Sequence, residues 1–132
     1  MPTSKEEADL RAHIEALAQG IRDKDVPALM KHYSPDIVTF DVRPPLKVQG
    51  EEYRKNFERW FAAMQGPIDY ETQDLRIAVS GDVAFCYSLS HVKGTWTSGK
   101  EADYWVRVTS GFQKINGRWL ITHEHVSMPA KM

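Results

Sequence analysis

The sequence has a single cysteine, Cys86, so the chain offers neither an internal disulfide nor the second thiolate of a zinc or redox motif. We expect Cys86 to be a small buried hydrophobic residue, as free cysteines usually are. No apolar run approaches the roughly 18–20 residues that a membrane span needs. The polar start, residues 1–7, lacks the hydrophobic region of a secretory signal, which predicts a cytoplasmic protein.

The sequence also lacks an excess of charge of either sign, because it contains 17 Lys and Arg and 18 Asp and Glu, which gives a formal net charge of -1. The charges are not gathered into runs of one sign, so the electrostatic footprint of nucleic-acid binding is absent. With 42% hydrophobic and 27% charged residues, the composition is that of an ordinary globular chain. Its length of 132 residues predicts one domain spanning residues 1–132.

The first half of the chain has apolar residues at the three- and four-residue spacing of helices. The predicted helices cover residues 5–23, a shorter segment that begins after Asp25, and residues 51–64. Ser4 and Glu7 have the spacing of a capping box at the start of the first helix, and Gly66-Pro67 is expected to end the third. Between the second and third helices, residues 37–41 predict a short strand, and Pro44-Pro45 predicts an extended loop.

After Pro67 the pattern changes to four strand-like runs that are separated by turn residues. The connections are too short for parallel crossovers, so these strands are expected to form an antiparallel meander. Helices followed by strands predict an α+β fold, with the helices covering one face of the sheet.

The dipeptide Asn116-Gly117 predicts a two-residue type I′ turn, which fixes the residues that lie opposite one another in the last hairpin. Counting outward from the turn pairs Ser110 with His123 and Val108 with His125. Both histidines then share a face with apolar residues, and we expect the helices to cover this face. The apolar residues are Val106, Val108, Phe112 and Ile121.

The same count places Glu124 diagonally opposite Arg107 on the outer face, close enough for an ion pair that would stabilise a subunit contact. A bulge between Ser110 and Phe112, which Gly111 would permit, would undo the count for the outer half of the hairpin. The inward direction of the two histidines therefore depends on a regular ladder.

Asp41 is a candidate general base, because it ends the predicted strand and is followed at once by the proline loop. Burial at the mouth of an apolar pocket would raise the pKa of its carboxyl toward neutrality, which suits removal of a proton next to a carbonyl. The alternative is that Asp41 caps the turn through a backbone N–H.

His123 and His125 are two positions apart on a strand, so the count directs both to one face about 7 Å apart. Such a pair can bind a metal, shuttle protons or form a polar floor for an anion, and the alternative is that each ring only donates to a neighbouring serine. A metal would need a third ligand, for which only Asp41 is an obvious candidate, so we predict no metal site. The expected ligand-binding residues are Tyr53, Phe57, Trp60, Val108, Ser110 and Phe112.

Several segments together suggest a family. They are residues 25–41, Gly81-Asp82-Val83-Ala84, Asn116-Gly117-Arg118-Trp119 and His123-Glu124-His125-Val126-Ser127. Their order and spacing resemble the SnoaL-like branch of the nuclear transport factor 2-like superfamily, especially its ketosteroid isomerase homologues. The resemblance covers nearly the whole chain and implies a cone-shaped, cystatin-like roll, with three N-terminal helices on a curved, mainly antiparallel sheet over a small-molecule pocket. It implies a homodimer, and we predict no cofactor.

By this resemblance, Asp41 falls where the steroid isomerases keep the Asp that moves a proton between carbons. The two acidic donors that hold the enolate in those enzymes correspond to Leu17 and to Thr109 or Ser110. Leu17 cannot donate a hydrogen bond, so the isomerase donor set is not reproduced. The end of the chain, from Trp119 to Ser127, also resembles the association domain of calcium/calmodulin-dependent kinase, a non-enzymatic relative that oligomerises.

Together these features predict a small-molecule pocket protein, an isomerase or lyase of the SnoaL-like class that acts on a small apolar carbonyl-type ligand by proton transfer. Asp41 would be the base, and His123 or His125 would orient or protonate the ligand. The alternative is a non-catalytic ligand-binding or dimeric assembly domain. A homodimer is expected in either case, without a nucleic-acid or membrane partner.

Overall fold

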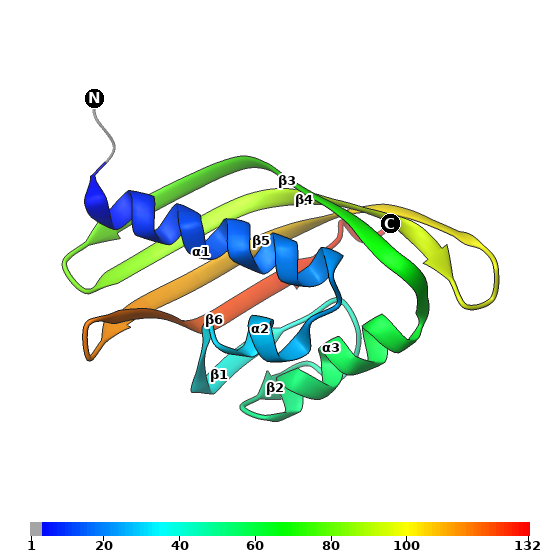
Figure 1. The fold of residues 1–132 in the computed structure, drawn as a ribbon, viewed down its shortest axis with the longest axis horizontal. Helices are drawn as coiled ribbons and strands as arrows, with labels where there is room; N and C mark the ends of the chain where they lie inside the picture. Colours follow the sequence, from blue (N-terminus) through cyan, green and yellow to red (C-terminus); the bar gives the residue numbers. More distant parts are fainter. Residues whose placement is uncertain (1–3) are drawn as a thin grey trace.

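The computed structural model describes residues 4–132, so residues 1–3 of the polar start lie outside it. In chain order the elements are α1 (Lys5–Arg22), α2 (Val26–Met30), β1 (Tyr33–Phe40), β2 (Val48–Gln49), α3 (Glu52–Ala62), β3 (Met64–Ser80), β4 (Val83–Trp96), β5 (Glu101–Ile115) and β6 (Arg118–Ser127). The strands form one six-stranded sheet in the order β2-β1-β6-β5-β4-β3. Helix α1 crosses the long strands, and α2 and α3 lie toward β1 and β2 (Figure 1).

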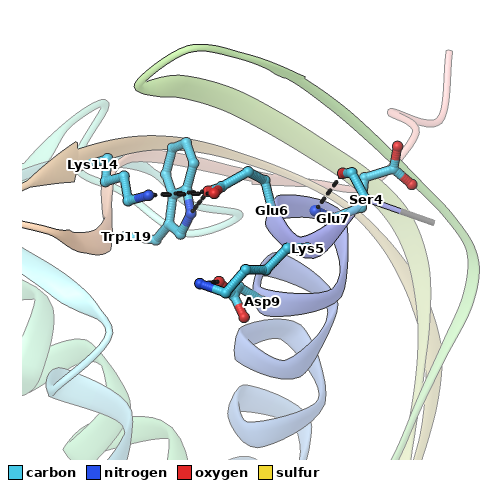
Figure 2. Close-up of polar contacts among 7 residues, drawn as sticks. All are labelled: Ser4, Lys5, Glu6, Glu7, Asp9, Lys114 and Trp119. Atoms are coloured by element: carbon cyan, nitrogen blue, oxygen red, sulfur yellow. Dashed lines mark hydrogen bonds and ion pairs between the residues drawn. The ribbon is translucent and has the colours of Figure 1, made fainter.

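Polar contacts anchor the first turn of α1. The Ser4 side chain accepts a hydrogen bond from the Glu7 N–H over 3.1 Å, which confirms the predicted cap. Glu6 accepts one from Trp119 Nε1 over 2.9 Å and lies 3.3 Å from Lys114 Nζ (Figure 2). The Trp119 N–H, and after it the Lys114 ammonium, lowers the pKa of the Glu6 carboxyl. The start of α1 is thereby tied to the hairpin of β5 and β6.

The third helix and the strand that follows it differ from the prediction. Helix α3 ends at Ala62 and β3 begins at Met64, so Gly66-Pro67 lies within the strand and does not end the helix. A proline is tolerated there because β3 is an edge strand and its pairing with β4 is irregular between Gln65 and Asp69. The missing N–H therefore breaks no regular ladder.

Strands β3 to β6 form the predicted antiparallel meander, and β1 and β2 extend the sheet beyond β6. Strand β1 runs parallel to β6, with Val38 opposite His123. It begins at Tyr33, earlier than predicted, and Pro35 falls where its pairing with β6 is interrupted. Strand β2, predicted as part of a loop, pairs with β1 through Val48. The fold is α+β with a mainly antiparallel sheet, as predicted.

The core fills the space between the helices and the inner face of the sheet. Its fully buried members include Leu10, Leu29, Ile37, Val92, Phe112 and Ile121. Cys86 is 1% exposed, which confirms that it is a buried side chain. Helices α1 and α2 approach closely at Gly20, where an added Cβ would lie 2.8 Å from Leu29 Cδ2. Within residues 4–132, no helix has the length and apolar character needed to cross a membrane.

Candidate functional site

Asn116 and Gly117 form the turn that the sequence predicts for the last hairpin. Both have positive φ, 52° and 80°, as a type I′ turn requires. The predicted pairing holds outward from the turn as far as Phe112, which lies opposite Ile121. This inner half of the register is confirmed.

A bulge changes the pairing beyond that point. Thr122 is the extra residue, so His123 lies opposite Gly111 and Glu124 lies opposite Ser110. One extra residue exchanges the two faces for the rest of the strand. The predicted pairing of Ser110 with His123 was therefore wrong, and Glu124 points inward in place of the histidines.

The two histidines lie on the outer side of the sheet, beside Phe40 of β1. The ring centroids of His123 and His125 are 4.8 Å and 5.5 Å from that of Phe40. His123 Nδ1 lies 2.7 Å from the Val38 carbonyl oxygen, to which it can donate. Neither histidine lines the pocket that Asp41 borders. The predicted cluster of one carboxylate and two imidazoles is therefore not assembled.

The predicted ion pair between Arg107 and Glu124 is not formed. Arg107 Nε instead donates to Ser127 Oγ over 3.0 Å. Glu124 is buried beneath the helices while Arg107 is exposed, because the same bulge puts the two side chains on opposite faces.

A pocket of about 420 Å³ lies between the helices and the inner face of the sheet, a size typical of small-molecule sites. Most of its lining is apolar, including Leu17 of α1 and Val126 of β6. Five of the predicted ligand-binding residues line it, namely Tyr53, Phe57, Trp60, Val108 and Ser110. Phe112 does not, because it is 1% exposed and packs within the core.

The buried carboxyl group of this pocket belongs to Glu124. Its Oε1 accepts hydrogen bonds from the hydroxyl groups of Tyr33, at 2.9 Å, and Tyr53, at 2.6 Å. Its Oε2 accepts one from Ser110 Oγ at 3.0 Å. The three donors come from β1, α3 and β5, so the tertiary fold and not a local motif builds this cluster.

Burial is the main influence on the proton affinity of Glu124 and raises the pKa of its carboxyl. The hydrogen bonds from Tyr53, Tyr33 and Ser110 oppose this rise without cancelling it, and the charge of Asp41 adds to it. Burial also raises the pKa of the Tyr33 and Tyr53 hydroxyl groups well above the ordinary value for tyrosine. Both hydroxyl groups therefore stay protonated and remain hydrogen-bond donors. A protonated Glu124 can keep Oε1 as the acceptor for the tyrosines while its Oε2–H donates to Ser110 or to a ligand.

Asp41 lies at the mouth of the same pocket, half-buried. Its Oδ1 accepts a hydrogen bond from the Val42 N–H over 2.7 Å, which is the turn-capping contact expected as the alternative role. Its Oδ2 lies 3.4 Å from Asn56 Nδ2 of α3. Asp41 therefore caps the loop and borders the pocket at once.

No group of three His, Cys, Asp or Glu side chains in the described part of the chain is arranged to hold a metal ion. The close histidine pair is His13 and His32, whose Nδ1 atoms are 2.7 Å apart outside the pocket. Burial lowers the pKa of both rings, that of His32 to about 4. This pair is a neutral structural contact between α1 and the residues that follow α2, and no sequence pattern predicted it.

Residues 10–131 match a family model described as the SnoaL-like domain. Similar solved structures include an NTF2-like protein of unknown function from Pseudomonas putida KT2440, which is 29% identical over 98% of this chain and 91% of that chain, with a TM-score of 0.88. A ketosteroid isomerase-like protein from Erwinia carotovora atroseptica SCRI1043 is 20% identical over 98% of this chain and 100% of that chain, with a TM-score of 0.83.

The association domain of CaMKII from C. elegans is also similar, with 15% identity over 93% of this chain and 95% of that chain and a TM-score of 0.74. At such low identity, it and the isomerase-like protein show a shared fold alone. No curated protein matches the chain. The comparisons confirm the NTF2-like, cystatin-like fold that the sequence resemblance implies.

Proposed function

The chain belongs to the SnoaL-like domain family, and on that basis we propose that its pocket binds a small, largely apolar carbonyl-type molecule and transfers a proton within it. The observation that supports this is Glu124, a carboxyl group that is 5% exposed and is held by three hydroxyl groups in a mainly apolar pocket. A carboxyl with a raised pKa keeps its proton to higher pH than an exposed one, and can donate it to a carbonyl oxygen.

In this proposal Asp41 is the base and Glu124 is the acidic donor. Asp41 removes a proton from the carbon next to the carbonyl, and Glu124 donates a hydrogen bond to the oxygen that becomes the enolate. The proton then returns to a different carbon in an isomerisation, or leaves with an eliminated group in a lyase reaction. Glu124 takes the role that the sequence suggested for His123 or His125, since neither imidazole lines the pocket.

A second candidate is a pocket that binds a ligand without turnover. The observation in its favour is Leu17, an apolar residue of the pocket at the place where the family resemblance puts a hydrogen-bond donor of the isomerases. A site with one acidic donor holds an enolate less well than a site with two.

Exchange of carbon-bound protons with solvent deuterium separates these candidates. We expect the protein to accelerate this exchange in cyclic ketones and enones, followed by NMR in D2O, and Asp41→Asn and Glu124→Gln each to slow it by about 100-fold or more. Asp36→Asn is the matched control, because Asp36 is exposed and does not line the pocket. Ligand binding without any exchange would favour the second candidate, and exchange that survives both pocket substitutions would contradict the proposed roles.

We further propose that the outer face of the sheet pairs with a second copy of the chain. Large apolar side chains are exposed together on β4 and β5, with Phe85 and Tyr87 at 50%, Leu89 at 39% and Trp105 at 42%. Such patches are typical of protein interfaces, and a two-fold axis lets the same patch face itself. The antiparallel ladder of β4 and β5 supplies a continuous surface for this contact.

Light scattering should therefore give the mass of a dimer at micromolar concentration. Tyr87→Glu should shift it to the monomer, because the contact would bury the new carboxylate without a partner. Leu46→Glu is the control, since Leu46 is 96% exposed in the proline loop. A monomeric wild type would contradict this proposal.

A further inference from the structure

The mouth of the pocket carries two cationic side chains that are left without an anionic partner. Arg43, in the loop after β1, and Arg59, near the end of α3, both line the pocket. Within residues 4–132, neither has a carboxylate within ion-pair distance. Arg54 of the same helix, by contrast, lies outside the pocket and pairs with Glu51 over 2.6 Å.

The acid at this mouth, Asp41, does not neutralise either arginine. Its two oxygens face the Val42 N–H at 2.7 Å and Asn56 Nδ2 at 3.4 Å. Asn56 Oδ1 accepts a hydrogen bond from Arg59 Nη2 over 2.6 Å. Asn56 thus stands between the acid and the cation, and it orients Arg59 without removing its charge. Two positive charges and one negative charge leave the mouth net positive.

The interior of the pocket has no cationic side chain. Among the described residues, Glu124 is the only other Asp, Glu, Lys or Arg in its lining, and its carboxyl is held by Tyr33, Tyr53 and Ser110. An anionic ligand group beside this buried carboxyl would meet a desolvation penalty with no cation to offset it, and any ionised fraction of Glu124 would repel it. A negative group is therefore favoured at the mouth and disfavoured at the floor.

One further donor is available along the wall. Trp60 Nε1 is buried and makes no hydrogen bond of good geometry among the described residues; its polar neighbour is the Tyr104 hydroxyl, whose pKa burial raises and this N–H lowers in part, and both residues line the pocket. Buried donors are normally satisfied, so a polar ligand atom can complete this one. This observation is independent of the two arginines and also indicates a ligand with polar groups at defined places.

We propose that the substrate class is an apolar molecule that carries a carboxylate. Arg43 and Arg59 bind the carboxylate at the mouth, and the apolar body lies along the wall, with its carbonyl against Glu124. Guanidinium groups suit this task because they donate several hydrogen bonds to a carboxylate and keep their charge at all physiological pH values. The position of the carbonyl rests on the proposed function, whereas recognition of the carboxylate does not.

A pair of probes that differ only in charge tests this inference. We expect naphthylacetate to bind the full chain about tenfold more tightly than its neutral analogue naphthylacetamide in calorimetric titrations at low salt, with the ratio falling as salt is added. In the double variant Arg43→Gln with Arg59→Gln, the ratio should fall to about one through weaker binding of the acid alone. Arg54→Gln, the matched control on the same helix, should leave the ratio unchanged.

The outcomes separate this inference from the proposed function. If the wild type binds both probes equally, or if the double variant keeps the preference for the acid, anion recognition by these arginines is overturned while the pocket remains a ligand site. If neither probe binds, the inference and the ligand-binding part of the proposed function fall together. If the protein prefers the acid but catalyses no deuterium exchange in any ketone, the proposed substrate class would be supported and the proposed proton transfer would be contradicted.

Discussion

Replacement of Glu124 by leucine is expected to lower the free energy of unfolding by about 3 kcal/mol, whereas replacement by glutamine should change it by less than about 1 kcal/mol. Leucine leaves the buried hydroxyl groups of Tyr33, Tyr53 and Ser110 without their acceptor, and each such group costs about 1–3 kcal/mol before the gain from the added apolar surface. Glutamine keeps Oε1 as the acceptor for the tyrosines and can donate from Nε2 to Ser110.

Urea unfolding would measure both differences in the free energy of unfolding, provided that its dependence on urea concentration is the same in all variants. Glu58→Leu is the matched control, because Glu58 is exposed on α3 and its loss should matter little. Equal stability of the leucine and glutamine variants at position 124 would show that the hydroxyl groups do not need this acceptor, and would contradict the network described for the pocket.

The pH dependence of these variants has a defined sign. The pKa of Glu124 is raised on folding, so its favourable contribution is present below the ordinary value of 4.5 and is lost as the pH rises through the folded value. Glutamine does not titrate. The wild type should therefore lose stability relative to Glu124→Gln as the pH rises above 4.5, and a gain would contradict the direction of the shift.

Phe112→Ala is expected to be more damaging still, with a loss of about 3–5 kcal/mol in the free energy of unfolding. Phe112 is 1% exposed, lies opposite Ile121 immediately before the bulge, and has its ring centroid 5.9 Å from that of His13 on α1. Removal of the ring would leave a cavity where α1 meets the last hairpin, and a close-packed site collapses only in part.

The control for this substitution is Phe85→Ala on the outer face, where the side chain is 50% exposed. Its loss should cost about 1 kcal/mol in dilute protein, since only half of the ring leaves water on folding. Thermal or urea unfolding of the two alanine variants compares them directly. Similar losses at both positions would mean that the core does not centre on Phe112.

Much of the fold could be predicted because its signals are local. The cap at Ser4, the helical spacing of apolar residues and the positive-φ turn at Asn116-Gly117 each act within a few residues, and the structure confirms them. The parallel pairing of β1 with β6 has no such signal, because it joins strands from the two halves of the chain. Strand β2, only two residues long, is too short to have a recognisable pattern.

The candidate site was predicted in part. The pocket wall and the place of Asp41 at its mouth followed from the sequence, because both depend on aromatic spacing and on the end of a strand. Glu124 was missed because a single extra residue, Thr122, exchanges the faces of β6. After Thr122, one face carries His123, His125 and Ser127 and the other carries Glu124 and Val126, so a single apolar residue was too weak a signal to choose between the two registers.

A signal for Glu124 was nevertheless present. It is the only acidic residue between Trp119 and Ser127, in a strand whose first part, Trp119 to Ile121, is apolar. The hydroxyl groups that make its burial possible belong to Tyr33 and Tyr53, which are 91 and 71 residues away in sequence. A contact at that distance is a property of the tertiary fold, so the sequence could suggest a buried acid without naming its partners.

The central claim is that Glu124 is a proton-holding carboxyl at the floor of the pocket. NMR titration of the glutamate side-chain carboxyl carbons, with the Glu124 signal assigned by its absence from Glu124→Gln, tests this directly. The structure predicts a midpoint above the ordinary value of 4.5 for this group. A midpoint at or below 4.5 would mean that the tyrosine and serine hydroxyls hold a permanent carboxylate, and Glu124 could not serve as the acidic donor.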